Sequence, residues 1–156
     1  MHEIACKLGP RKSKALGFFH AFTGCDVTSF FAGKGKRSAW DAWRVCPAIT
    51  DVFCDLASQP MHVSDEAMEE IERFVVVMYV RTRELSKVNV ARQRMFSKGS
   101  RSIENIPPTA DALYQHTLRA TYQAGHVWAT CLQKAPVIPS PADWGWTEVN
   151  GKWTPV

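Results

Sequence analysis

The amino-acid sequence predicts a mainly α-helical domain of five to six helices that ends in a small C-terminal β-hairpin. Apolar residues recur at helical spacing along most of the chain, and capping or breaking residues separate the periodic stretches. Near the C-terminus an Asn-Gly pair lies between short apolar–polar alternations, which is typical of a tight hairpin turn. With 156 residues, 46% hydrophobic and 22% charged, the chain is long enough to bury one core.

The first part of the chain predicts three helices. Residues 12–23 carry apolar residues at helical spacing and end at Gly24. A second helix is expected over 36–46, between a glycine-containing turn and a proline. Thr50 is suited to cap a short third helix, which Pro60 closes.

The clearest helix follows Ser64, whose hydroxyl is suited to cap it. Asp65 and Glu66 then lie at the positive end of the helix dipole. The β-branched run 75–77 would also suit a strand, but the helical flanks on both sides favour a buried helix. The acidic residues of this stretch are expected to form a solvated face. A further helix is expected over 88–97.

Residues 100–108 are expected to form a loop, because a Pro-Pro pair breaks regular structure there. Thr109 is then suited to cap a long helix that reaches about Lys134. Gly125 lies inside this stretch and costs a helix roughly 1 kcal/mol relative to Ala. It therefore predicts a close packing contact or a bend.

The C-terminal tail is rich in proline and tryptophan. Residues 144–149 and 152–154 are expected to pair as a ribbon around the turn at Asn150 and Gly151. We expect one compact domain with four stretches: a disordered or truncated start (1–10), a helix-hairpin-helix-like region (11–60), a helical core (61–135) and the tail (136–156).

Charge and cysteine content limit the function classes. A net charge of +4 and an isoelectric point near 8.9 are compatible with a polyanion such as nucleic acid as a partner. Five cysteines, an odd number with no CxxC pair and no zinc-like spacing, predict a reduced, intracellular protein. The longest apolar run, 74–80, is far too short to span a bilayer, and no stretch has the pattern of a signal peptide. We expect no membrane association.

The stretch FTGCDVTSFFAGKGKRSAW, residues 22–40, carries the strongest functional signal. It is not a nucleotide-binding phosphate loop, because Phe30 stands where a glycine is required and Arg37 where Ser or Thr is required. Gly33 and Gly35 allow a tight turn, and a helix that begins directly after it offers free N–H groups to a phosphate. Positive charge is added at the same place by Lys34, Lys36 and Arg37. The pattern predicts a hairpin that grips a nucleic-acid backbone without reading bases.

This block resembles the GCDY…I-x-G-I-G-P-K-x-A segment of flap-endonuclease and XPG-type nucleases, which have a PIN-like fold. The resemblance implies that Asp26 is a metal-binding carboxylate and that Gly33 and Gly35 belong to a helix-hairpin-helix element on the DNA backbone. With the neighbouring basic side chains, the expected nucleic-acid-binding set is Gly33, Lys34, Gly35, Lys36 and Arg37. The sequence departs from the family pattern at Val27, Lys34 and Lys36.

The same resemblance implies an incomplete catalytic site. A two-metal site needs several carboxylates on different elements, and the family supplies most of them upstream of this segment. Only one acidic residue, Glu3, precedes Asp26 in this sequence. We therefore expect an incomplete C-terminal region of a PIN-like nuclease that is not an enzyme by itself, with Mg²⁺ bound only in a full-length parent.

Four further stretches, HAFTGCD, ERFVV, IENIPPT and SPADWGW, resemble a group of uncharacterised, mobile-element-derived animal proteins, and this likeness spans nearly the whole chain.

The leading interpretation is a nucleic-acid backbone binding fragment of such a protein, acting inside the cell and in the nucleus. One alternative is a protein-interaction or structural helical domain that docks through its Trp-rich tail onto the remainder of a longer polypeptide or a protein partner. The other is a metal-dependent nuclease in the full-length parent.

Each candidate residue also has a structural interpretation. Asp26 can simply cap a turn, and the basic cluster can be an ordinary solvated turn. Trp40 and Trp43 are expected to lie in the core rather than to form a base-stacking platform. The tail tryptophans are expected to pack against the long helix. The nucleic-acid interpretation gains strength if the fold places the other basic residues, among them Arg92 and Arg94, on the face that carries residues 34–37.

Overall fold

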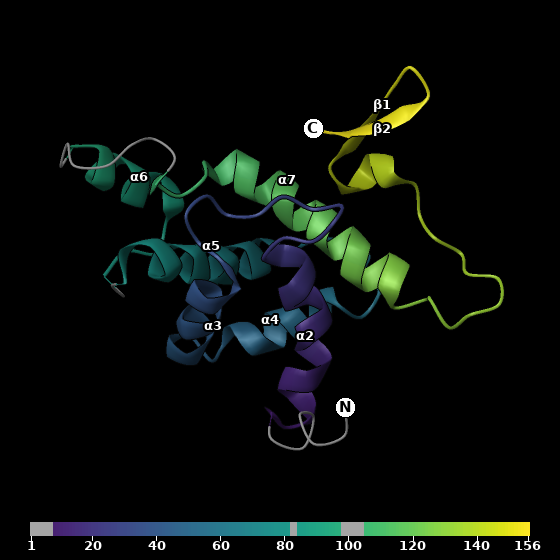
Figure 1. Cartoon of the computed structure of the whole chain (residues 1–156), viewed down its shortest axis with the longest axis horizontal. Helices are drawn as coiled ribbons and strands as arrows, with labels where there is room; N and C mark the ends of the chain where they lie inside the picture. The colour runs from purple at the N-terminus through teal and green to yellow at the C-terminus, as the bar shows by residue number, and fades with distance from the viewer. Residues whose placement is uncertain (1–7, 82–83, 98–104) are drawn as a thin grey trace.

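The computed structural model describes residues 8–81, 84–97 and 105–156. Within these ranges six α-helices pack together, and a two-stranded antiparallel sheet follows them near the C-terminus (Figure 1). The prediction of a mainly α domain with a small C-terminal hairpin is therefore confirmed. The α-helices are α2 (Pro10–Phe22), α3 (Lys36–Val45), α4 (Ile49–Leu56), α5 (Asp65–Val80), α6 (Val88–Ser97) and α7 (Ala110–Thr121).

An aromatic cluster forms the centre of the domain, where α2, α3, α4 and α5 meet. The ring centroid of Phe53 lies 5.1 Å from that of Phe18, 5.3 Å from that of Trp43 and 5.4 Å from that of Phe74. These four side chains are fully buried, and each stabilises the fold by about 2–3 kcal/mol through burial of apolar surface. Trp40 packs edge-on against Trp43, so the expectation that both belong to the core is confirmed.

Helix α4 begins earlier than the sequence predicts. It starts at Ile49, after Ala48, and its N-terminus has no side-chain cap. The prediction that Thr50 is the cap is wrong, because its hydroxyl accepts a hydrogen bond from the indole N–H of Trp43 at 2.8 Å inside the core. The threonine thus satisfies a buried donor that would otherwise be without a partner.

Helix α5 forms as predicted. The Ser64 hydroxyl accepts the backbone N–H of Ala67 at 3.2 Å, which confirms the expected cap. The β-branched run from Val75 to Val77 lies within the helix and is buried, so the helical interpretation of this stretch is correct.

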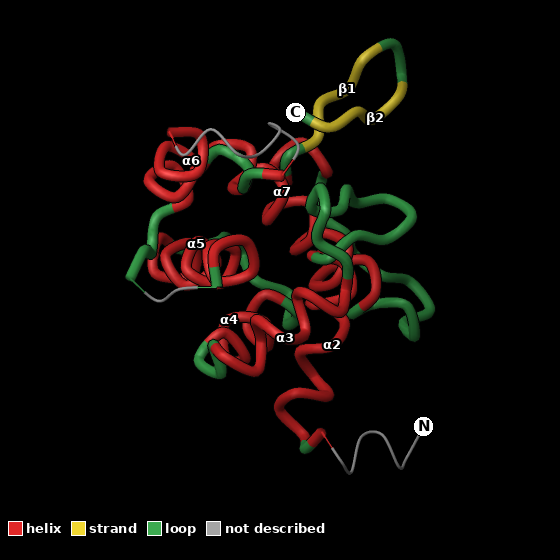
Figure 2. Tube along the Cα trace, turned by 60° about the vertical axis from the view of Figure 1, so that its left-hand side comes forward, coloured by secondary structure: helices red, strands yellow, loops and turns green. Residues whose placement is uncertain are grey.

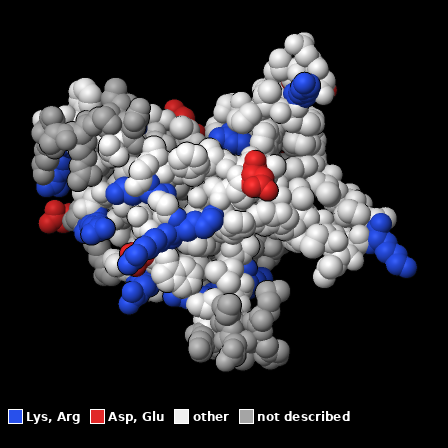
Figure 3. All heavy atoms as spheres, viewed as in Figure 1, with Lys and Arg blue, Asp and Glu red and all other residues white. Residues whose placement is uncertain are grey.

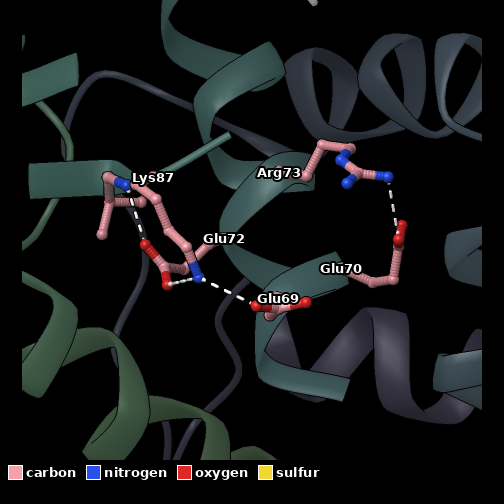
Figure 4. A network of polar contacts seen from close by, with 6 residues as sticks. Glu69, Glu70, Glu72, Arg73 and Lys87 are labelled. Carbon is pink, nitrogen blue, oxygen red and sulfur yellow. Dashed lines mark hydrogen bonds and ion pairs between the residues drawn. The ribbon is translucent and has the colours of Figure 1, made fainter. Parts of the chain in front are cut away.

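The acidic face of α5 connects this helix to α6 (Figure 4). One carboxylate oxygen of Glu72 accepts the backbone N–H of Val88, the first residue of α6, at 2.9 Å. The other pairs with Lys87 at 3.3 Å. Glu72 therefore caps a neighbouring helix and meets the positive end of its dipole. A separate exposed pair on the same face joins Arg73 and Glu70 at 2.9 Å.

Helix α7 is shorter than predicted. The Thr109 hydroxyl accepts the N–H of Ala112 at 3.2 Å, as expected for the cap. The regular α-helix ends at Thr121, and a π-helical segment, η2 (Tyr122–Trp128), follows it. The prediction of one continuous helix to about Lys134 is therefore wrong.

The close packing predicted at Gly125 is confirmed, and its partner is the end of α4. A Cβ atom at Gly125 would lie 2.5 Å from the carbonyl oxygen of Leu56 and 2.9 Å from Cδ of Pro60. Only glycine permits this approach of two backbones. The contact lies in the middle of η2, so the change in helix type coincides with the point of closest packing.

The hairpin consists of β1 (Trp146–Val149) and β2 (Lys152–Pro155). Asn150 and Gly151 form the predicted turn between the strands, with the positive φ angles of 52° and 75° that a type I′ turn requires. Figures 1 and 2 show the hairpin projecting from the helices. Trp144, in the short helix η3 (Pro141–Trp144), is buried, and its ring centroid lies 4.6 Å from that of His126. This contact anchors the tail to η2.

The structure also bears on two features expected from the sequence, the lack of a membrane-spanning helix and the state of the cysteines. In the described ranges no helix combines the length and the apolar character that crossing a bilayer requires. The cysteines of the same ranges carry free thiols, whereas Cys6 lies outside the described residues.

We expect Gly125→Ala to lower the free energy of unfolding by about 1–2 kcal/mol, because overpacking against Leu56 exceeds the gain in helix propensity. Gly17→Ala in α2 is the matched control, because a Cβ there meets nothing within 4 Å. This control should stabilise the protein by roughly 0.5–1 kcal/mol. Urea unfolding of both variants measures the difference, and equal stabilities would contradict the packing role of Gly125.

Candidate nucleic-acid interface

The predicted site residues lie in the connection between α2 and α3, which consists of two tight turns. In the first, Cys25 and Thr28 exchange backbone hydrogen bonds of 3.2 and 3.3 Å. The Thr28 hydroxyl also donates to the carbonyl of Ala21 at 2.6 Å and so holds this turn on the end of α2. In the second, the N–H of Lys34 donates to the carbonyl of Phe31 at 2.9 Å.

The two glycines of the motif have different roles. Gly33 has a φ of +66°, and a Cβ there would lie 2.7 Å from Oδ1 of Asn105, so the turn requires glycine at this position. Gly35 is the N-cap of α3 with extended backbone, and a Cβ there meets nothing within 4 Å. The second glycine leaves the start of α3 open to solvent but is not required by conformation.

Lys36 is engaged in the fold. Its ammonium group donates to the carbonyl oxygens of His20 and Gly24 at 3.2 and 2.7 Å, and to the hydroxyl of Thr23 at 3.0 Å. An ammonium group has three donors, and all three are used here. Burial lowers the pKa of Lys36 below the ordinary value of a lysine. Lys36 therefore caps the C-terminal end of α2, a role that its place in a basic cluster did not predict.

The other two basic residues of the motif lie differently. The Lys34 ammonium lies 5.2 Å from the ring centroid of Tyr79, as in a cation–π contact. Arg37 is exposed in the first turn of α3 and makes no ion pair or hydrogen bond with any side chain in the described ranges. The positive charge of Arg37 is not cancelled by a carboxylate in the part of the chain that the structure describes.

The start of α3 has the electrostatic character of an anion site. Among the residues that the structure describes, no side chain caps it, and its first turn holds no acidic residue. The first N–H groups of a helix have no partner within the helix, and the dipole places partial positive charge there. Two basic side chains in the first turn add to this charge, which is unfavourable unless an anion binds.

Asp26 lies exposed at the tip of the first turn. Its carboxylate makes no hydrogen bond or ion pair within the described ranges, and Thr28, not Asp26, closes the turn. Across those ranges His, Cys, Asp and Glu form no group of three or more that could hold a metal ion. Glu3, the other acidic residue considered with Asp26, lies outside the described residues.

His116 is a residue of this region that sequence reasoning did not place here. Its Nε2 donates to the carbonyl of Phe22 at 2.7 Å, which leaves Nδ1 to accept the hydroxyl of Ser29 at 3.1 Å. Burial lowers the pKa of His116 to about 4, and the charge of Arg119 acts in the same direction. The neutral imidazole therefore joins α7 to the end of α2 and to the turn region. Its sequence position, 94 residues from Phe22, gave no signal of this contact.

On the face drawn in Figure 3, the Lys and Arg side chains are unevenly distributed. Figure 3 shows Lys and Arg mainly over the half of this face that carries α3, α5 and α6. Arg92 of α6 lines the same cavity as Ala32 and Tyr79, next to the second turn. Arg94, by contrast, pairs with Glu84 at 3.7 Å. The fold thus brings one of the distant arginines, Arg92, to the candidate site.

Lys36→Met should lower the free energy of unfolding by about 1–2 kcal/mol, because three acceptors at the end of α2 lose a charged donor. Arg37→Ala is the neighbouring control and should change stability by less than about 0.5 kcal/mol, since this side chain is exposed. Urea titrations of the two variants measure the contrast. An unchanged midpoint for Lys36→Met would show that the carbonyl contacts do not stabilise the fold.

His116 should make the protein less stable in acid. The unfolded state binds a proton near pH 6.5 and the folded state only near pH 4, so stability is full above pH 6.5 and falls as pH decreases toward 4. Between pH 7 and 4.5 the loss from this residue should be about 2 kcal/mol. His116→Gln, unfolded in urea at both pH values, should show a smaller decrease than the wild type. An equal decrease would assign the acid sensitivity to other groups.

Comparison of the chain with protein-family models, with curated proteins and with solved structures finds no match in any of the three.

Proposed function

We propose that this chain binds the sugar–phosphate backbone of nucleic acid through the second turn and the start of α3. The supporting observation is the uncapped, acid-free start of α3, a helix of ten residues with two basic side chains in its first turn. A phosphate there accepts hydrogen bonds from free N–H groups and meets the positive end of the dipole. Contacts of this kind position a protein on nucleic acid but carry no base sequence information.

The side chains divide into those that contact phosphate and those that hold the turn. Lys34 and Arg37 supply the phosphate contacts, and the guanidinium group of Arg37 can bind two phosphate oxygens at once. Lys36 holds α2 through its three acceptors and contributes charge at the site but no free donor. Gly33 shapes the turn.

No catalytic step is assigned to the described residues. A nuclease of the flap-endonuclease type needs several carboxylates around its Mg²⁺ ions, and Asp26 lies on an exposed turn without such companions in the described ranges. The residues present therefore do not fit a Mg²⁺ site. In our proposal Asp26 becomes a metal ligand only if a longer parent chain supplies the remaining carboxylates.

The tail provides less support for a protein-docking function. A docking surface there would need Trp144, Trp146 and Trp153 to form one exposed apolar patch. Trp144 is buried against His126, and Trp146 is half-buried. Trp153 is the one of the three with substantial exposure, at 43%.

Salt titration of nucleic-acid binding tests the proposal. We expect the logarithm of the binding constant to fall linearly with the logarithm of salt concentration, and each phosphate contact that is removed should lower the slope by about 0.9 on duplex DNA. Lys34→Ala and Arg37→Ala should each show this change, without a change in stability. Lys152→Ala, which removes an exposed lysine from the hairpin, should leave the slope unchanged. Absence of binding at low salt, or equal slopes for all variants, would refute the proposal.

A further inference from the structure

A cavity of about 340 Å³ lies directly beside the second turn. Residues 29–32, the end of α5, α6 and α7 form its walls. The Tyr79 hydroxyl donates to the carbonyl of Ala32 at 3.1 Å, and the Lys34 ammonium lies over the ring of Tyr79. The cavity and the proposed phosphate contacts therefore belong to one continuous surface.

The cavity has a positive electrostatic character. Arg92 and Arg119 both line it, and none of the Asp and Glu residues that the structure describes does so. Arg92 donates to the carbonyl oxygen of Pro107, and Arg119 donates to that of Gly145 at 3.0 Å. Neither arginine pairs with a carboxylate in the described part of the chain. Both guanidinium groups are thus hydrogen-bonded without loss of their charge, which favours an anionic ligand.

An exposed aromatic ring stands at the rim of this cavity. Phe30 lines the cavity and is 76% exposed, although a large apolar side chain usually gains free energy by burial. Gly24 allows the chain to fold closely under Phe30, because a Cβ there would lie 2.7 Å from the Cβ of Phe30. The preceding residue, Ser29, is fixed by its hydrogen bond to His116. The ring is therefore presented on a backbone that is held on both sides.

We propose that this cavity and Phe30 bind one unpaired nucleotide of a single-stranded nucleic acid. The base stacks on the ring of Phe30, as bases stack on exposed aromatic side chains in proteins that bind single strands. A phosphate of the same nucleotide faces Arg92, and the strand continues toward Lys34 and Arg37. The inference rests on the proposed backbone binding and adds the substrate class, because paired bases inside a duplex cannot offer a face to Phe30.

Fluorescence anisotropy with the full chain tests this inference. The probes are a labelled oligo-dT strand and a labelled blunt duplex with the same number of phosphates, at one low salt concentration. Phe30→Ala should weaken binding of the strand roughly tenfold and leave binding of the duplex unchanged. Ala112→Phe should have the same effect, because it fills the cavity from α7 without removing a charge.

Phe96→Ala is the matched control, since Phe96 is 68% exposed and does not line the cavity. It should leave the affinity for both probes unchanged. Thermal unfolding identical to that of the wild type establishes that each variant is folded. If Phe30→Ala weakens both probes equally, or neither, the inference is overturned while backbone binding stands. If the wild type binds neither probe, backbone binding itself is overturned.

Discussion

The candidate site depends on how the last carbonyl groups of α2 are satisfied. A helix leaves its final four C=O groups without donors from its own backbone. In this protein each of the four, from Phe19 to Phe22, accepts a hydrogen bond from a side chain. The donors come from widely separated points of the chain: Thr23, Thr28, Lys36 and His116. The end of one helix therefore fixes the two turns, the start of α3 and the contact with α7.

This arrangement gives neighbouring basic residues different roles. The ammonium group of Lys36 lies at the negative end of the α2 dipole, where a cation is favourable. Two carbonyl oxygens and the hydroxyl of Thr23 accept its three hydrogen bonds there. The end of α2 therefore stabilises this charge without neutralising it. Arg37, one residue later, extends from the first turn of α3 into solvent. In the described ranges no side chain caps the start of α3 and its first turn holds no acidic residue, so Arg37 and the free helix N–H groups favour an anion there.

The sequence predicted the features that local interactions determine. The caps at Ser64 and Thr109 and the turn at Asn150 depend on residues a few positions apart, and all three form as expected. The predictions that were wrong concern contacts between different helices. Thr50 of α4 accepts a hydrogen bond from the indole of Trp43 in α3, and η2 forms where Gly125 meets the end of α4. For the site, the turn at Gly33 was predictable from residue types. The roles of Lys36 and His116 were not, because their acceptors lie on another helix.

The basic residues have different kinds of partner in different parts of the molecule. Some of those away from the turn pair with carboxylates, as Arg11 does with Asp51 and Lys87 with Glu72, which cancels charge locally. Near the turn Lys36, Arg92 and Arg119 donate to carbonyl oxygens, and Lys34 lies over an aromatic ring. A carbonyl satisfies the donors but contributes only a dipole, so the net charge remains. Positive charge thus lies where the fold also provides an open helix start, a cavity and an exposed ring, and our proposal of a single-stranded ligand rests on these features together.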